Sequence, residues 1–385
     1  MLEILVTAII SFIVAFLAIP VVIFMADKKK LYDIPDERKL HRHAIASLGG
    51  VGIFLGFAFA SLLTINFSKY PEFQYFLSAI FIIFFIGLKD DLVLLSATKK
   101  FIAQIIAAAI IIHLGGIEIT SFYGLVGIYD LEPMIGVPLT YITIILIMNA
   151  FNLIDGIDGL AGSLGLLATL LIGTYFYYSG MYAYAAFSYA LSASLLAFLI
   201  FNFNPARIFM GDSGSLLIGT IASILVLKFI TVASSPDAVV PVTSALAIGV
   251  AVLIIPLIDT LRVFTIRIVK GRSPFSPDRN HVHHLLLDSG FSHSSVTLIC
   301  VSATIVLVMA TYLTRSFGNT FLIIALFATS FAVLGYLYFT LPRRRMAIHR
   351  QHVANRARRQ QQMKPASKVI SLNTKEELKT EEVKL

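Results

Sequence analysis

Acidic side chains recur at the ends of apolar segments of this chain. They are Asp90, Asp91, Asp155, Asp158 and Asp212. An ionised side chain inside a bilayer costs roughly 2.5–3.5 kcal/mol on insertion scales, so such groups are kept where protein or water surrounds them. Carboxylate oxygens are also the ligands that Mg²⁺ prefers. The pattern is typical of a catalytic site built into a membrane protein.

Asp90 and Asp91 are adjacent carboxylates that follow the apolar run 76–88. Two neighbouring carboxylates repel each other unless they share a divalent cation or a proton. The alternative is a helix end whose solvated acids pair with nearby lysines such as Lys89 and Lys100. The pair by itself does not separate the two interpretations.

The stretch 149–162 has a polar residue at every third position. These residues are Asn149, Asn152, Asp155 and Asp158, and glycines recur with the same step at 156, 159 and 162. On one continuous helix a three-residue step rotates by about 300°, so the polar row would stay on one flank. The glycines would allow a backbone or a ligand to come close. Helix packing through small residues is the alternative, and it explains the glycines but not the two acids.

A break followed by a Gly-rich helix start is predicted over 203–215. Pro205 ends the preceding helix, and Gly211-Asp212-Ser213-Gly214 opens the next one. Asp212 or Ser213 could be the N-cap. The same helix start would expose backbone N–H groups suited to phosphate, and a carboxylate beside them suits Mg²⁺. The two interpretations are compatible.

A basic cluster lies further along the chain, in a long polar loop. Its members are Arg279, His281, His283 and His284. Three histidines so close together could bind zinc, but no cysteine or second histidine cluster lies at ligand spacing. Arginine and histidine donors around a diphosphate agree better with the acids upstream.

The composition indicates which elements position these residues. Of 385 residues, 57% are hydrophobic and 14% charged, and the mean hydropathy is +0.85. This predicts an all-α integral membrane protein with about eleven transmembrane helices. The predicted spans are 2–25, 48–66, 73–88, 101–115, 137–153, 164–180, 183–203, 213–233, 240–264, 295–313 and 319–341.

Lysine and arginine gather in alternate loops and after residue 342. The positive-inside rule then predicts an N-terminus outside, a cytoplasmic C-terminus and a site that faces the cytoplasm. We expect a catalytic membrane domain over 1–342 and a basic, disordered cytoplasmic tail over 343–385. The net charge of +8 is interpreted as orientation against an anionic leaflet, so no nucleic-acid polymer is expected as a partner.

Four motifs in order carry a family resemblance. DD at 90–91, NLIDGIDGLAG at 152–162, FMGDSGS at 209–215 and HVHH at 281–284 resemble those of the polyprenyl-phosphate N-acetylhexosamine-1-phosphate transferases, glycosyltransferase family 4. The resemblance covers roughly residues 1–342. The forms PARIFMGDSGS and His-x-His-His are more similar to the branch that uses UDP-N-acetylglucosamine and undecaprenyl phosphate. Ala44, Ala46 and Ser47 stand where many members have prolines and a basic residue.

The resemblance implies an Mg²⁺-dependent enzyme, with Mn²⁺ as a substitute, in the bacterial cytoplasmic membrane. It would transfer N-acetylglucosamine-1-phosphate from UDP-N-acetylglucosamine to undecaprenyl phosphate, release UMP and start a cell-envelope glycan such as O-antigen or teichoic acid. A homodimer is one arrangement that it implies. Asp90 and Asp91 would be catalytic, and the metal ligands would be Asp212, Asn152 and Asp91. The substrate-binding residues would be Lys100, Asp155, Asp158, Arg279, His281, His283 and His284.

Two other functions stay open at this point. One is transfer of phospho-N-acetylmuramoyl-pentapeptide in peptidoglycan synthesis. The other is an ion-coupled membrane transporter, which would also explain acids within the membrane. Transporter sites usually lie near the midplane on broken helices, whereas these acids are predicted at helix ends on one side. Release of UMP separates enzyme from transporter.

Overall fold

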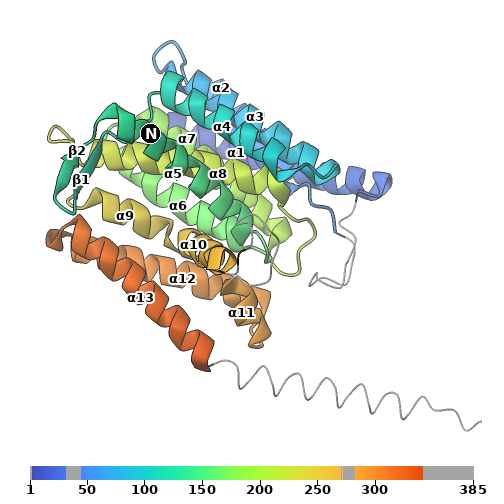
Figure 1. The fold of residues 1–385 in the computed structure, drawn as a ribbon. Helices are drawn as coiled ribbons and strands as arrows, with labels where there is room; N and C mark the ends of the chain where they lie inside the picture. Colours follow the sequence, from blue (N-terminus) through green and yellow to red (C-terminus); the bar gives the residue numbers. More distant parts are fainter. Residues whose placement is uncertain (1, 32–44, 270, 272–281, 341–385) are drawn as a thin grey trace, which may run out of the picture.

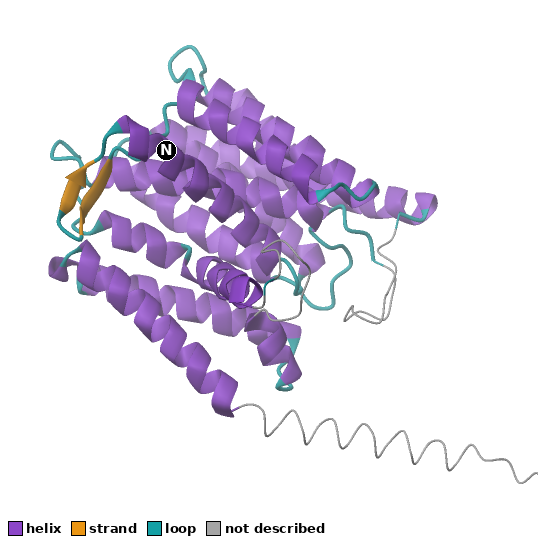
Figure 2. Cartoon of the chain, viewed as in Figure 1, coloured by secondary structure: helices purple, strands orange, loops and turns teal. Residues whose placement is uncertain are grey.

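The computed structural model describes residues 2–31, 45–269, 271 and 282–340, the side chains of 282–284 excepted. They form a bundle of long helices with one small hairpin (Figure 1, Figure 2). The helices are α1 (Leu2–Lys29), α2 (Gly49–Thr64), α3 (Glu72–Leu92), α4 (Ala97–Ala109), α5 (Pro133–Ile154), α6 (Leu160–Tyr178), α7 (Tyr182–Asn202), α8 (Gly211–Ala233), α9 (Ala245–Val252), α10 (Ile254–Val269), α11 (Val282–Asp288), α12 (His293–Leu313) and α13 (Asn319–Thr340). A π-helical turn, Ile110–Leu114, continues α4, and a short 3-10 turn, Arg315–Phe317, precedes α13.

Eight of the described helices are long and apolar enough to cross a membrane, or nine if the bent pair α9–α10 forms one span. The eight are α1, α4 with its π-helical turn, α5, α6, α7, α8, α12 and α13. The other two predicted spans fall on α2, which has 16 residues, and on α3, whose last turn carries Lys89, Asp90 and Asp91. The mainly helical membrane fold is confirmed. The count of about eleven spans and the orientation of the termini stay predictions.

The predicted span 240–264 falls on a helix that is broken in the structure. The break lies at Leu253, and α9 and α10 meet at an angle of 74°. Pro256 lies in the first turn of α10, where a residue without an N–H cannot continue the hydrogen-bond ladder of α9. As a result α10 crosses the direction of the neighbouring helices and is seen end-on in Figure 1.

A small β-hairpin departs from the all-α prediction. β1 (Ser121–Leu125) and β2 (Ile128–Asp130) pair antiparallel, with Ser121 opposite Asp130. The start of α13 holds this hairpin: Asn319 Nδ2 donates to the carbonyl of Tyr123 at 2.7 Å. The hairpin lies at one end of the bundle, the end at which the N-terminus is also found (Figure 1).

The centre of the bundle is formed by α7 and α8. In each of these helices 83% of the apolar stretch is buried. α8 packs against α2, α3, α5 and α6. Stacked and edge-on phenylalanine rings fill the space between α2, α3 and α7, including Phe57, Phe73 and Phe187. α13, with 11% buried, lies at the periphery. Because α8 is central, its first turn is a fixed point against which the ends of its neighbours are placed.

Candidate active site

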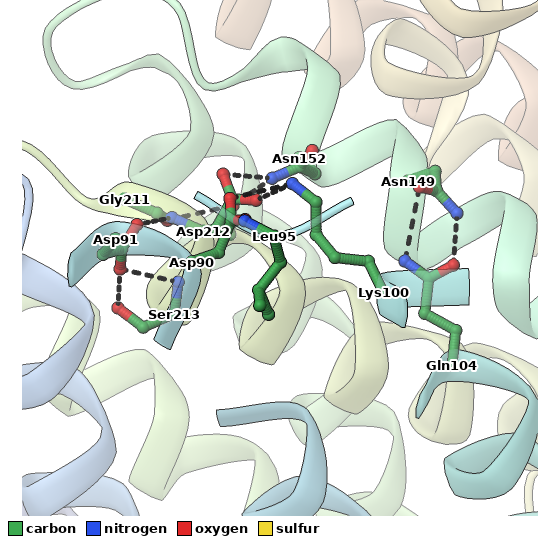
Figure 3. Close-up of polar contacts among 11 residues, drawn as sticks. Asp90, Asp91, Leu95, Lys100, Gln104, Asn149, Asn152, Gly211, Asp212 and Ser213 are labelled. Atoms are coloured by element: carbon green, nitrogen blue, oxygen red, sulfur yellow. Dashed lines mark hydrogen bonds and ion pairs between the residues drawn. The ribbon is translucent and has the colours of Figure 1, made fainter. Parts of the chain in front are cut away.

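Four helix ends meet at the end of the bundle away from the hairpin: the last turn of α3, the first turns of α4 and α8, and the last turn of α5 (Figure 1, Figure 3). Glycines allow this approach. A Cβ on Gly50 of α2 would overlap Gly214 of α8, and a Cβ on Gly87 of α3 would come within 2.6 Å of the Ser213 Cα. Backbones therefore touch where side chains would keep the helices apart.

The first turn of α8 is capped by a carboxylate from another helix. Asp91 of α3 accepts from the backbone N–H of Asp212 at 2.7 Å, from that of Ser213 at 3.0 Å and from the Ser213 hydroxyl at 2.6 Å (Figure 3). The residue at the N-cap position, Met210, makes no side-chain cap. The alternative interpretation, in which Asp212 or Ser213 is the N-cap, is therefore wrong, because Asp91 satisfies these free N–H groups instead.

Gly211 makes this capping geometry possible. Its φ is +74°, and a Cβ there would collide with the Ser47 carbonyl and lie 2.7 Å from the Asp91 carboxylate. A residue with a side chain would be strained by the backbone angle and would push Asp91 away. Glycine at 211 thus allows α3 to hold the start of α8.

A lysine links two of the predicted acids. Lys100 Nζ lies 2.9 Å from Asp90 Oδ2 and 2.7 Å from Asp212 Oδ2. The other oxygen of Asp90 accepts from the Leu95 backbone N–H at 2.7 Å, so both oxygens of Asp90 are engaged within the protein. Asp212, with 25% of its side chain exposed, is the more open of the two acids, since Asp90 has 9% exposed.

Asn152 approaches Asp212 from α5. Its Nδ2 donates to Asp212 Oδ1 at 2.9 Å (Figure 3). The same Nδ2 donates to Ser215 Oγ at 3.0 Å. Among the described residues its amide oxygen accepts no hydrogen bond. Lys100 and Asn152 therefore hold the two oxygens of Asp212 from two different helices. Asn152 and Asp212 were predicted as metal ligands and Lys100 as a substrate-binding residue, and the structure brings the three together.

The stretch 149–162 is not one helix. α5 ends at Ile154, and α6 starts at Leu160 after Gly159, whose φ is +78°. Asn149 and Asn152 lie on α5, whereas Asp155 and Asp158 lie in the turn between the helices. The expected polar row along one flank is therefore wrong. The turn directs Asp155 back toward the start of α8, where it lies against the Gly211 backbone N–H.

The turn concentrates negative charge near Asp212. Burial, followed by the charges of Asp212, Asp91 and Asp158, raises the pKa of Asp155 to about 8. A carboxyl group whose proton is held this firmly lies in a region where a cation is stabilised. The electrostatics of the site thus favour a positively charged ligand.

Asp158 has a different set of partners. Its Oδ1 lies 3.2 Å from His293 Nδ1 at the start of α12, and its Oδ2 accepts from the Ala206 backbone N–H at 3.3 Å. Its carbonyl accepts from the Thr297 hydroxyl at 3.0 Å. Asp158 therefore ties three segments together. His293 was missed from the sequence because a single histidine at a helix start carries no motif.

Asn202 is the second residue that the sequence did not reveal. It is buried, accepts from the Gly159 N–H at 2.8 Å through Oδ1 and donates to the Ile208 carbonyl at 2.8 Å through Nδ2. It therefore connects the turn after α5 with the loop before α8. Asparagine beside a predicted turn is common, so the sequence offered no specific signal.

The remaining predicted residues belong to the basic cluster 279–284. Arg279 and His281 are outside the described residues. His283 and His284 belong to the first turn of α11, but their side chains are not described. Their predicted part in binding the substrate stays a prediction.

The donor chemistry of the cluster fits a hard divalent cation. Among the described residues no group of three or more His, Cys, Asp or Glu forms a ready-made metal site. The Lys100 ammonium instead stands between Asp90 and Asp212, a position suited to a cation that bridges carboxylates. Asp212 and the amide oxygen of Asn152 offer hard oxygen donors there, which suit Mg²⁺.

Comparison of the sequence with known proteins shows the family to which the chain belongs. Residues 73–230 match the model of glycosyl transferase family 4. The undecaprenyl-phosphate alpha-N-acetylglucosaminyl 1-phosphate transferase of Salmonella typhimurium is 30% identical over 378 residues, 94% of this chain and 98% of that protein. The enzyme of the same name from Haemophilus influenzae is 36% identical over 297 residues, 75% of this chain and 81% of that protein. The chain belongs to glycosyl transferase family 4.

A relative from a different bacterial group extends this likeness. The probable undecaprenyl-phosphate N-acetylglucosaminyl 1-phosphate transferase of Bacillus subtilis is 32% identical over 304 residues, 78% of this chain and 81% of that protein. The family segment 73–230 runs from the start of α3 into the last turns of α8. It includes every carboxylate of the cluster as well as Lys100 and Asn152, so the residues that the fold brings together lie within the family's own segment.

Proposed function

We propose that this member of the family transfers N-acetylglucosamine-1-phosphate from UDP-N-acetylglucosamine to undecaprenyl phosphate and releases UMP in an Mg²⁺-dependent reaction. Relatives with this named activity match the chain over most of its length. The observation that carries the proposed mechanism is the convergence of Lys100 and Asn152 on Asp212 at the start of α8. The product would start a cell-envelope glycan.

The reaction joins two anions. An oxygen of the lipid phosphate forms a bond to the β-phosphorus of the sugar nucleotide, and the bond from that phosphorus to the bridging oxygen of UMP breaks. Positioning and charge neutralisation are the main contributions a protein can make to such a transfer. A phosphate monoester has a second pKa near 6, so at pH 7 the attacking group is mostly dianionic and needs little help from a base.

Asp90 is better suited to orient Lys100 than to take a proton. Its two oxygens already accept from the Leu95 N–H and from the Lys100 ammonium. Lys100 in turn has three donor hydrogens, so it can turn one toward a phosphate oxygen while it stays in contact with an acid. We therefore assign Lys100 to phosphate binding and Asp90 to its alignment.

Asp212 and Asn152 would hold the Mg²⁺. A bound divalent cation would neutralise the charge of the diphosphate. Asp91 is fully used in capping α8, so its part is to fix the position of Asp212. Burial and the neighbouring carboxylates raise the pKa of Asp155 to about 8, so Asp155 would add negative charge behind the site only once it has released its proton. Arg279, His281, His283 and His284 would contact the phosphates.

The cytoplasm is the proposed location of the site. α1 starts at the hairpin end of the bundle and ends in Lys28 and Lys29 at the end where the acids lie (Figure 1). Lys89 and Lys99 flank the acids at the same end. This excess of lysine supports a cytoplasmic orientation by the positive-inside rule.

The test is a substrate panel on the purified full-length protein. UMP is counted after incubation with undecaprenyl phosphate and UDP-N-acetylglucosamine, UDP-N-acetylgalactosamine or UDP-N-acetylmuramoyl-pentapeptide, each with Mg²⁺ or with EDTA. We expect UMP from UDP-N-acetylglucosamine with Mg²⁺ and undecaprenyl phosphate both present. UMP formed only from the pentapeptide nucleotide, or release that EDTA does not reduce, would refute the proposal.

A further inference from the structure

A pair of side-chain amides joins α4 to α5 beside the site. Gln104 Nε2 donates to Asn149 Oδ1 at 3.3 Å, and Asn149 Nδ2 donates back to Gln104 Oε1 at 3.0 Å (Figure 3). Asn149 Nδ2 also donates to the Ile145 carbonyl of its own helix at 2.8 Å. The last bond fixes the orientation of the Asn149 amide, so the pair can form in one arrangement.

The two amides lie about one helical turn from the residues that hold Asp212. Gln104 follows Lys100 by four residues on α4, and Asn149 precedes Asn152 by three residues on α5. Residues at these spacings share a helix face. Lys100 reaches Asp212 Oδ2, whereas Asn152 reaches Asp212 Oδ1. The distance between α4 and α5 therefore sets how both groups meet one carboxylate.

Burial of Gln104 strengthens the link between the two amides, of which Asn149 is half-buried. Gln104 is 3% exposed, and in a water-poor interior an amide that loses its partner costs more than it would at the surface. Neither amide hydrogen-bonds to Asp90, Asp212 or Lys100 among the described residues. Their effect on the site must pass through the helices that carry them.

We propose that Gln104 and Asn149 are positioning residues that set the spacing of Lys100 and Asn152 around Asp212. The proposal rests on the proposed role of Asp212. It distinguishes this pair from an ordinary stabilising contact, because breaking it should impair turnover even where the protein stays folded. A displacement of about 1 Å in a reacting arrangement can cost on the order of a hundredfold in rate.

The decisive variant removes both amides at once, as Gln104→Met with Asn149→Leu. Replacing both partners by apolar groups of similar shape is nearly neutral for stability, so the thermal midpoint should stay near that of the parent. We expect kcat to fall by about tenfold or more, the KM for UDP-N-acetylglucosamine to stay within about twofold, and the Mg²⁺ concentration for half-maximal rate to rise. The exchanged pair, Gln104→Asn with Asn149→Gln, should recover a large part of kcat.

A matched control breaks a buried pair far from the site. Thr169 Oγ1 and Ser192 Oγ lie 2.7 Å apart between α6 and α7, and the variant Thr169→Val with Ser192→Ala should keep kcat and the Mg²⁺ requirement. A folded double apolar variant with kcat within about twofold of the parent would overturn the proposal, whether or not the exchanged pair folds. If the double apolar variant does not fold, the single variant Gln104→Met is judged by the same criterion. Full activity of Asp212→Asn would instead refute the proposed site itself.

Discussion

The cap that Asp91 provides to α8 yields the prediction with the most direct structural basis. Substituting Asp91 by Ala removes the acceptor for two backbone N–H groups and one hydroxyl in the first turn of α8. Hydrogen bonds to a charged group contribute about 1.5–3 kcal/mol each, and loss of an N-cap costs about 0.5–2 kcal/mol. Such contributions do not add fully. We therefore expect a loss of about 3 kcal/mol in the free energy of unfolding.

The consequence for the site follows from the place of Asp212. Asp212 is the second residue of α8, and its own N–H is among the three donors released. Water or a shifted backbone would have to satisfy these donors, so the carboxylate should move relative to Lys100 and Asn152. Asp91→Ala should thus lower both the thermal midpoint and the rate of UMP release.

The assay is thermal unfolding of the purified protein in detergent, with UMP release measured below the midpoint. About 2 °C per kcal/mol for a large domain converts the expected loss into a midpoint lower by about 6 °C. The control is Asp237→Asn, which removes a negative charge from an exposed loop and should change neither quantity. A midpoint for Asp91→Ala equal to that of the control would refute the capping argument. If the midpoint stays high while activity is lost, Asp91 acts directly on substrate or metal.

Three further predictions concern the same end of the bundle. Lys100→Met should lower kcat by about a hundredfold or more, as for loss of a donor that stabilises developing charge. Because Asp90 and Asp212 would then lack the ammonium group between them, Mg²⁺ should raise the thermal midpoint of this variant more than that of the parent. An unchanged kcat would contradict this prediction. The pKa of Asp155 is raised to about 8, so the apparent Mg²⁺ affinity should rise as the pH increases from about 7 to 9 and this group releases its proton. Asp155→Asn should flatten that dependence. Since the folded pKa exceeds the value of 3.8 for an ordinary Asp, the contribution of the group to stability should fall over about pH 4 to 8. Asn202→Leu removes two hydrogen bonds and leaves a buried N–H and a carbonyl unpaired. The free energy of unfolding should fall by about 2–4 kcal/mol, which is measured as a lower thermal midpoint. A parental midpoint would show that the two loops do not depend on Asn202.

The sequence predicted the cluster itself because the acids and amides stand at the ends of apolar segments. Asp90, Asn152 and Asp212 come from three separate motifs, whereas Lys100 was predicted from the family resemblance. The structure links the four residues through a chain of hydrogen bonds. A helix end is easy to find from hydropathy, and ends on one side of a membrane must lie at similar depth. That reasoning holds without any knowledge of helix packing.

The local geometry could not be predicted in the same way. A three-residue repeat of Asn, Asp and Gly agrees with a helix and with a turn. In the structure it forms a turn, in which Gly159 has a φ of +78° and donates its N–H to Asn202. The cap of α8 by Asp91 joins residues 121 positions apart. Such a contact depends on glycine-mediated packing of α3 on α8, which has no signature in the sequence of either helix.

The structural roles of isolated polar residues could not be predicted from the sequence either. His293 and Asn202 each occur alone beside a predicted break, where a solvated side chain is the usual outcome. Their importance follows from partners in distant segments, namely Asp158 for His293 and Gly159 for Asn202. The bend between α9 and α10 was likewise hidden, because the apolar segment continues through Pro256 without interruption.

The central claim is that carboxylate and amide groups from distant helices hold a divalent cation and transfer a phospho-sugar at the start of α8. The most direct test compares purified Asp212→Asn with the parent for UMP release from UDP-N-acetylglucosamine and undecaprenyl phosphate across a range of Mg²⁺ concentrations. The account predicts a folded variant with the parental thermal midpoint, no stabilisation by Mg²⁺ and almost no UMP. A folded Asp212→Asn protein with near-parental turnover and the same Mg²⁺ dependence would contradict it.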